Sequence, residues 1–416
     1  MSTVTRAPAL APFRVRSFRF QWPSDLAASW AFEMETLILG WYILVETGSV
    51  LLLTLFASLQ YVGTLLSPLF GVAGHRLGNK RVYCAMRGFY ALLATLLMVL
   101  ALTGDLQPLH VFVITALMGL VRPSDLVMRH ALIGETLPVG QFVGGASISR
   151  TTQDSARVMG ALTGAGLVAT LGIGLAYVAV ALFYFASLLL AFGVNARPNA
   201  LDHASAPRVS VYRDLRDGLS YVWNTPPLLA AIWVALLVNL TAFPLVNGLL
   251  PYVAREIYGT DQTGLGYLVA GFAGGALVAS LLLTRFGHAV QPARMMISAC
   301  AWWYLLTLLF VQVDSIAAGV ALLLLSGFAQ SLSMVTMAAM LLRSSEERFR
   351  SRVMGIRMLA IYTLPIGLMA SGPLIEHFGF RMTGSAYCII GLVLTFWIGW
   401  RWREHIWQGT ASSNLH

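Results

Sequence analysis

The most regular feature of the sequence is a series of apolar runs, each about 20 residues long, separated by short segments with Gly, Pro or charged residues. A helix of that length spans the roughly 30 Å hydrocarbon core of a bilayer. The runs therefore predict an all-α polytopic membrane protein. The Gly, Pro and charged residues between the runs divide them into twelve expected transmembrane helices, at residues 24–45, 50–72, 82–103, 109–131, 142–170, 174–194, 219–249, 264–286, 295–313, 315–341, 353–375 and 381–402.

One connection differs from the others because it is long and polar. It carries several arginines and aspartates and separates six predicted helices from the next six. The expected organisation is a cytoplasmic segment, a six-helix bundle, a cytoplasmic linker, a second six-helix bundle and a cytoplasmic tail, at residues 1–23, 24–194, 195–218, 219–402 and 403–416. No cleavable signal is expected, because no small-residue cleavage site follows the first arginines.

Composition and charge agree with a membrane protein. Apolar residues make up 57% of the chain and charged residues 11%, whereas soluble proteins carry about 25% charged residues. The net charge is +9, and Lys and Arg favour cytoplasmic loops. With both termini inside, only Arg255 and Arg381 are expected outside. The charge thus indicates orientation in a cell inner membrane and contact with anionic lipids, and no nucleic-acid partner is expected.

A membrane-embedded enzyme is the alternative from a different class. It would need nucleophiles, bases or metal ligands that converge on one cavity. The eight histidines fall in predicted loops, tails or helix ends, the three cysteines lie in apolar runs without paired spacing, and no HExxH, GxSxG or Walker sequence occurs. We therefore expect no enzyme activity, no metal and no cofactor. Transport would draw on an ion gradient, a substrate gradient or a partner.

The loop between the second and third predicted helices is glycine-rich and basic. It reads GVAGHRLGNKR and resembles the corresponding loop of the major facilitators in Gly71, Gly78, Lys80 and Arg81. Two six-helix halves that rock about a midplane site are the layout of that family. There an acidic residue of the loop latches the cytoplasmic gate, and His75 stands in its place here. A weaker latch is therefore expected. The alternative is a basic loop that only follows the charge rule.

Three further stretches resemble the drug:proton antiporter branch of that family, which includes the enterobactin exporter and macrolide efflux proteins. They are RHALIGETLP at 129–138, ARVMGALTGAG at 156–166 and LLPYVAREIYGTDQTGLGYLVAGFAGGAL at 249–277. The second matches the glycine-rich antiporter stretch except at Ala161, where the family usually has proline. The resemblance implies export of a small amphipathic molecule, drug-like or a siderophore, with protons as the exchanged partner. We expect a monomer.

Two glycines of the second stretch have a physical interpretation without the family. Gly160 and Gly164 are four residues apart, so they lie on one helix face and let a neighbouring backbone approach closely. Ordinary helix packing accounts for them. The resemblance adds a role in sealing the pathway against proton leak.

Two carboxylates lie inside the first predicted span, where a charge costs about 2.5–3.5 kcal/mol and normally faces a cavity or a partner. Glu33 and Glu35 lie about 200° apart on the helix wheel, so both cannot face one cavity. Glu33 lies about 14 Å into the helix, near the midplane, where relatives often have an acidic residue. We predict that Glu33 binds protons or substrate and that Glu35 forms a buried structural pair. A satisfied structural carboxylate is the alternative for Glu33.

The fourth predicted helix carries a stripe of alternating charge. Arg122, Asp125 and Arg129 are three and four residues apart, so Asp125 can pair with either arginine. In the major facilitators the first, fourth, seventh and tenth helices line the cavity. The resemblance therefore makes Arg122 and Asp125 candidates for the translocation path.

The fifth predicted helix repeats this spacing with Arg150, Asp154 and Arg157. Asp154 is a candidate for proton coupling. The structural alternative for both stripes is a cytoplasmic gate of ion pairs. Its arginines would be Arg129, Arg150, Arg157 and Arg352.

Polar and aromatic side chains of the cavity-lining helices complete the predicted site. They are Trp30, Asn239, Asn247 and Gln330. A mostly apolar pocket with few polar groups suits an amphipathic ligand, and helix packing is the alternative for each residue. The charge of the substrate stays open, because Glu33 would suit a cationic drug and the arginines an anionic siderophore. An importer or facilitator of the same fold is the alternative in direction.

Overall fold

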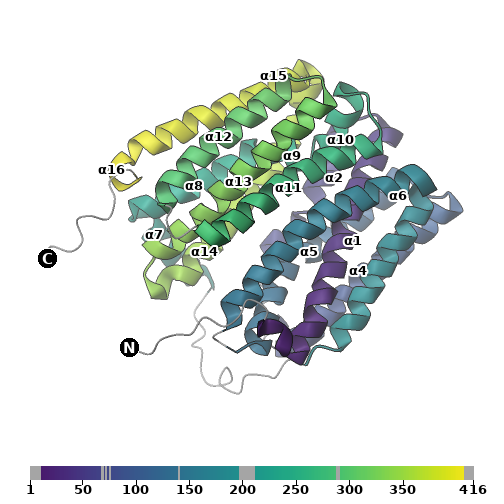
Figure 1. The fold of residues 1–416 in the computed structure, drawn as a ribbon, viewed down its shortest axis with the longest axis horizontal. Helices are drawn as coiled ribbons and strands as arrows, with labels where there is room; N and C mark the ends of the chain where they lie inside the picture. Colours follow the sequence, from purple (N-terminus) through teal and green to yellow (C-terminus); the bar gives the residue numbers. More distant parts are fainter. Residues whose placement is uncertain are drawn as a thin grey trace. The chain divides into compact units, whose positions relative to one another are not determined.

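A computed structural model of the chain describes residues 11–66, 70, 73–74, 76–138, 141–195, 211–286 and 291–406. Every regular element in these ranges is helical (Figure 1). The predicted all-α class is therefore confirmed.

The α-helices are α1 (Arg16–Thr47), α2 (Val50–Leu59), α4 (Asn79–Thr103), α5 (Pro108–Thr136), α6 (Phe142–Phe192), α7 (Val211–Trp223), α8 (Pro226–Thr241), α9 (Phe243–Asn247), α10 (Leu250–Tyr252), α11 (Gln262–Phe286), α12 (Pro292–Gln312), α13 (Ile316–Ser344), α14 (Arg350–Leu359), α15 (Thr363–Arg401) and α16 (Arg403–Ile406). Short 3-10 turns lie at Ala11–Arg14, Val62–Leu66, Glu347–Phe349 and Ala360–Tyr362, and a π turn at Val253–Ile257.

Two of the longest helices are interrupted by a glycine. Gly172 divides the 51 residues of α6 with φ 77° and ψ 172°, and Gly379 divides the 39 residues of α15 with φ 78° and ψ 164°. A positive φ is accessible to glycine without a steric penalty. Both glycines lie where the sequence predicted the end of one span and the start of the next.

Among the described residues, seven helices are long and apolar enough to cross a membrane, or eight if the bent pair α7–α8 counts as one span. The chain bends by 107° between these two helices. The predicted start of the seventh span at residue 219 is therefore wrong, since the apolar helix begins at Pro226. Thr225 has an extended backbone, φ −116° and ψ 95°, which is the conformation favoured before a proline.

The chain forms two compact units, each described by itself. Unit 1 contains Met1–Gly48, Leu59–Ser205 and Asp261–Gly266, and unit 2 contains Ser49–Ser58, Ala206–Thr260 and Tyr267–His416. Helix α2 thus groups with the C-terminal helices. Its Ser58 hydroxyl donates to the carbonyl of Pro365 at 3.4 Å, and Gly372 of α15 lies against Leu51. The domain boundary at residues 195–218 stays a prediction.

In unit 1, helix α6 packs along both α1 and α4 (Figure 1). The Ser24 hydroxyl of α1 donates to the carbonyl of Ser187 at 2.8 Å. The Trp30 indole donates to the Thr163 hydroxyl at 2.8 Å. Polar bonds of this kind hold α1 and α6 together in addition to close van der Waals packing.

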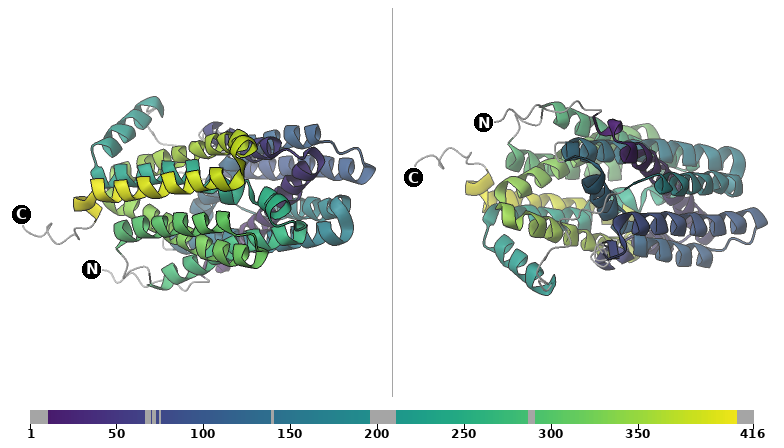
Figure 2. Two further views of the ribbon diagram at one scale, coloured as in Figure 1. Left: turned by 90° about the horizontal axis from the view of Figure 1, so that it is seen from above. Right: turned by 90° about the horizontal axis from the view of Figure 1, so that it is seen from below.

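In unit 2, helix α15 runs beside α8 and α12, and α12 packs on α13 (Figure 2). The centre of this packing is aromatic, with Trp303, Tyr304 and Phe310 fully buried. The Tyr304 and Thr241 hydroxyls lie 2.7 Å apart, and Thr307 and Ser326 bond at 3.0 Å. These four hydroxyls are thus paired between helices.

The contact of Gly160 with α1 gives a testable prediction. A Cβ at Gly160 would lie 2.7 Å from the Glu33 Cβ and 3.1 Å from the Trp30 carbonyl oxygen. Gly160→Ala is therefore expected to destabilise the protein by about 1–3 kcal/mol through overpacking, measured as a lower melting temperature in detergent. Gly166→Ala is the matched control, because a Cβ there meets nothing within 4 Å. Equal melting temperatures for the two variants would contradict the tight α1–α6 contact.

Candidate functional site

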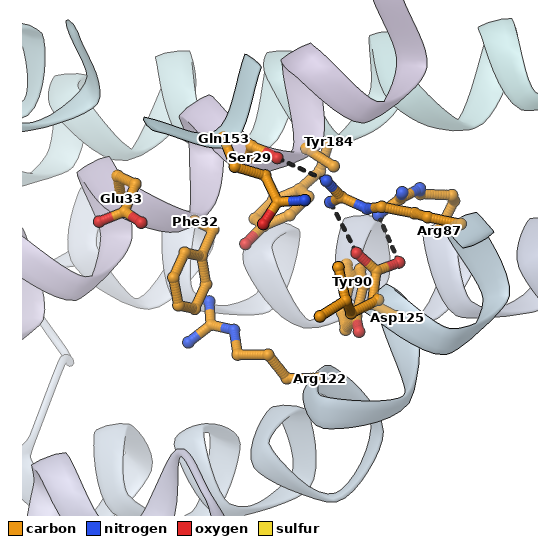
Figure 3. A pocket seen from close by; sticks show the side chains of 12 residues that line it. Ser29, Phe32, Glu33, Arg87, Tyr90, Arg122, Asp125, Gln153 and Tyr184 are labelled. Atoms are coloured by element: carbon orange, nitrogen blue, oxygen red, sulfur yellow. Dashed lines mark hydrogen bonds and ion pairs between the residues drawn. The ribbon is translucent and has the colours of Figure 1, made fainter. Parts of the chain in front are cut away.

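A cavity of about 170 Å³ lies inside unit 1, between α1, α4, α5 and α6 (Figure 3). Its walls combine apolar side chains with several charges. They are Ala28, Ser29, Phe32, Glu33, Arg87, Tyr90, Arg122, Asp125, Leu126, Arg129, Gln153 and Tyr184. Helical periodicity explains which residues of α1 line the cavity. Ser29, Phe32 and Glu33 are spaced by three and four residues and therefore share one face of the helix.

Four buried charges form a closed network on one side of this cavity. Arg87 is 0% exposed and lies 2.7 Å from Asp25 and 3.0 Å from Asp125. Arg129 lies 2.6 Å from Asp125 and 3.3 Å from Asp25. Two arginines and two aspartates cancel in charge, which is the condition for burying ions in a membrane helix bundle.

Neutral side chains of α1 and α4 support this network with hydrogen bonds. The Tyr83 hydroxyl of α4 donates to Asp25 at 2.7 Å. The Ser29 hydroxyl accepts from Arg129 at 2.7 Å, and the Gln21 amide donates to the Arg129 carbonyl at 3.0 Å. The network is therefore held by hydrogen bonds to neutral side chains as well as by its own ion pairs.

A second buried cluster is built around Glu35. Its carboxylate lies 3.2 Å from Arg122 and accepts hydrogen bonds from the Tyr177 and Tyr184 hydroxyls at 3.1 and 3.0 Å. Arg122 also donates to Gln60 at 3.1 Å. The expected structural pair of Glu35 is thus present. The expectation that Asp125 pairs with either arginine of its stripe holds only for Arg129, since Arg122 binds Glu35 instead.

Glu33 differs from Asp125, the other carboxylate that lines the cavity. Its side chain lines the cavity (Figure 3) and is 19% exposed, and the Arg157 guanidinium lies 4.0 Å from its carboxylate. Asp154, in contrast, pairs with Arg150 at 3.2 Å on the same helix. Asp154 and Arg157 do not line the cavity. Glu33 is therefore the lining carboxylate with the longest distance to an arginine.

Tyr90 was not singled out by the sequence. Its side chain is 5% exposed, lines the cavity (Figure 3), and its hydroxyl has no hydrogen-bond partner among the described residues. A buried hydroxyl without a partner carries a free-energy penalty. It is therefore available to a bound molecule or to water in the cavity. Its ring lies 5.8 Å from that of Tyr184.

Other predicted site residues lie away from this cavity. Trp30 stacks on Phe183 with 5.4 Å between ring centroids, so it packs between helices. Asn239 donates to the carbonyl of Ala235 on its own helix at 2.8 Å, and Gln330 is buried in α13. Asn247 ends α9. The last three belong to unit 2.

The residues predicted to form the gate are only partly described. Gly71 and His75 lie outside the described residues. Gly78 precedes α4 with φ 91°, and Lys80 and Arg81 lie in the first turn of that helix. Arg352, which the sequence predicted as a gate residue, lies in α14, with its guanidinium 5.4 Å from the Phe349 ring centroid.

Asp25 and Arg87 were missed by the sequence analysis. Asp25 is at the beginning of the predicted first span and Arg87 near the beginning of the third, and neither was considered as a site residue. Charge balance could have identified both residues from the sequence, because an arginine in an apolar run requires a carboxylate partner. Within the described part of the chain, no group of three His, Cys, Asp or Glu side chains could hold a metal ion.

Comparison with known proteins adds the family. A family model described as transmembrane secretion effector, one of the major facilitator families, matches residues 7–410. No curated protein sequence matches the chain. The fold is similar to a bacterial homologue of the human lysosomal transporter Spinster, at 11% identity and a TM-score of 0.71, with 95% of this chain and 99% of that chain covered.

Two further solved structures share the fold. The nucleoside transporter NupG has 14% identity and a TM-score of 0.68, with 92% of this chain and 98% of that chain covered. The human organic anion transporter TETRAN has 15% identity and a TM-score of 0.66, with 94% and 100% covered. At these identities the similarity shows the fold alone.

Proposed function

Because the chain belongs to the transmembrane secretion effector family of the major facilitators, we propose that it exports a small amphipathic molecule in exchange for protons. Transporters of this fold alternate between inward-open and outward-open states by rocking two halves about a central site. Each proton that enters would drive one substrate molecule out. A single chain is sufficient for this cycle.

For the membrane topology, we infer twelve spans in two groups of six. Helices α6 and α15 each count as two spans, on either side of Gly172 and Gly379. The remaining eight are α1, α2, α4, α5, α8, α11, α12 and α13. An even number places both termini on one side, and the basic termini favour the cytoplasmic side of the cell inner membrane.

The observation that carries the proposal is the contrast between Glu33 and Asp125, the two carboxylates that line the cavity. Asp125 lies 2.6 Å from Arg129 and 3.0 Å from Arg87. Glu33 has Arg157 only at 4.0 Å. Protonation of Asp125 would remove a negative charge that Arg87 and Arg129 both contact. Glu33, in contrast, can bind and release a proton without breaking a short ion pair. Glu33 is therefore the proposed proton carrier.

The same distances favour a cationic substrate over an anionic one. The three arginines of the cavity wall each have a carboxylate within 3.3 Å. Among the charged side chains of the cavity wall, Glu33 thus has the most distant partner of opposite charge, and its own charge is negative. Ala28, Phe32 and Leu126 supply apolar surface for the body of the substrate. A lipophilic cation that competes with a proton for Glu33 would be exchanged for it.

Export can be tested in cells that express the chain, with ethidium as the first probe in a panel of lipophilic cations. Expressing cells are expected to retain less probe than cells with an empty vector. A protonophore should abolish the difference, because it removes the driving gradient.

The direction and the coupling have separate readouts in this experiment. Higher retention in expressing cells would contradict export and favour an importer of the same fold. Probe that still moves uphill after the proton gradient is collapsed would contradict proton antiport.

A further inference from the structure

A groove on the surface of unit 2 runs along α12 and α15, which lie side by side (Figure 1). Its volume is about 670 Å³, within the range of cavities that hold small ligands. The walls are mostly apolar and end in one arginine. The defining residues are Ser298, Trp302 and Leu305 of α12, Phe396 and Trp400 of α15, and Arg403 at the start of α16.

We propose that this groove binds one anionic phospholipid, with an acyl chain between the aromatic side chains and the phosphate at Arg403. The aromatic walls are open to the surroundings of the protein, since Trp302 is 59% and Trp400 64% exposed. Small residues form the floor between them. A Cβ at Gly399 would lie 3.2 Å from Ile297, so the two helices are already in close contact there.

The length of the groove fits one leaflet of a membrane. The lining extends from Leu392 to Arg403. The part within α15, which ends at Arg401, covers ten residues, or about 15 Å at 1.5 Å per residue. Half of a hydrocarbon core measures about 15 Å. An acyl chain that fills the groove would therefore bring its head group to the level of Arg403.

Charge at the open end favours a negative head group. A second hollow of about 490 Å³ adjoins the groove and shares Trp400 and Arg403 with it. Arg401 and Glu404 border the same hollow, and the Arg401 guanidinium lies 5.6 Å from the Trp402 ring centroid. Two arginines against one glutamate leave a net positive charge. A phosphate can therefore bind there, and a zwitterionic head group would gain less.

Native mass spectrometry of the full chain in detergent can test this site. The probes are phosphatidylglycerol and phosphatidylcholine with identical acyl chains. We expect one tightly retained phosphatidylglycerol, and Arg403→Gln should weaken its binding about fivefold, the effect of one basic residue near a lipid phosphate. Arg401→Gln is the matched control, because Arg401 borders the hollow but does not line the groove. It should have a smaller effect.

The position of the acyl chain needs an independent readout. Phosphatidylglycerol with brominated acyl chains should quench tryptophan fluorescence, and Trp302→Phe should remove a part of that quenching. Ala301 also lines the groove, so Ala301→Phe should fill it and displace both lipids. Equal retention of the two lipids by the wild type would overturn the proposal, as would equal effects of the two arginine variants or unchanged lipid binding in Ala301→Phe.

Discussion

Arg87→Met is expected to lower the free energy of unfolding by about 3–5 kcal/mol, the effect of removing one partner from a buried ion pair. Arg87 is fully buried and lies within 3.0 Å of both Asp25 and Asp125. Without it, two buried carboxylates share only Arg129. A lower melting temperature in detergent, with less folded protein in the membrane, is the measurement.

Two further variants separate charge imbalance from lost packing. Arg87→Met combined with Asp125→Asn restores neutrality, since Asp25 keeps Arg129 at 3.3 Å, so part of the stability should return. Arg150→Met is the control, because Arg150 is 54% exposed and pairs with Asp154 within one helix. Arg150→Met should lower the free energy of unfolding by less than about 1 kcal/mol. Equal melting temperatures for Arg87→Met and Arg150→Met would refute a network that depends on charge balance.

The helical membrane class could be predicted because it depends on local properties. Apolar runs about 20 residues long indicate spans whatever their neighbours are, and the glycines at 172 and 379 lie where breaks were predicted. The start of α8 could not be placed as well. The polar residues before Pro226 belong to another helix, α7, and the two helices are bent by 107° at the short break between Trp223 and Pro226. A change of direction leaves no trace in hydropathy.

The candidate site was predicted in part. Features that depend on spacing within one helix could be predicted, whereas contacts between helices that are distant in the sequence could not. The face of α1 that carries Glu33 and the stripe of Arg122, Asp125 and Arg129 follow from helical spacing within one element. Partner choice depends on packing between elements. Arg87 reaches Asp25 across 62 positions in the sequence, and Arg122 reaches Glu35 across 87. Spacing within the helix allowed Asp125 to pair with either Arg122 or Arg129, and packing between helices pairs Arg122 with Glu35 instead.

The largest functional effect is expected for Glu33→Gln, with Glu35→Gln as its matched comparison two residues away. If one proton exchanges for one monovalent cation, a gradient of about one pH unit supports about tenfold accumulation, since each tenfold ratio corresponds to about 1.4 kcal/mol. Glutamine cannot take up and release the proton. Accumulation by the Glu33→Gln variant should therefore fall to about onefold, while downhill movement of the substrate can continue.

Glu35→Gln should behave differently because Glu35 already binds Arg122, Tyr177 and Tyr184. Removing its charge leaves Arg122 without a carboxylate, so the variant should be less stable and less abundant. The folded fraction should still accumulate substrate. Proteoliposomes with an acidic interior, no membrane potential and ethidium outside measure both variants at equal protein content. Gradient-driven accumulation that survives in Glu33→Gln but disappears in Glu35→Gln would show that the proton is carried by Glu35, on the opposite face of α1.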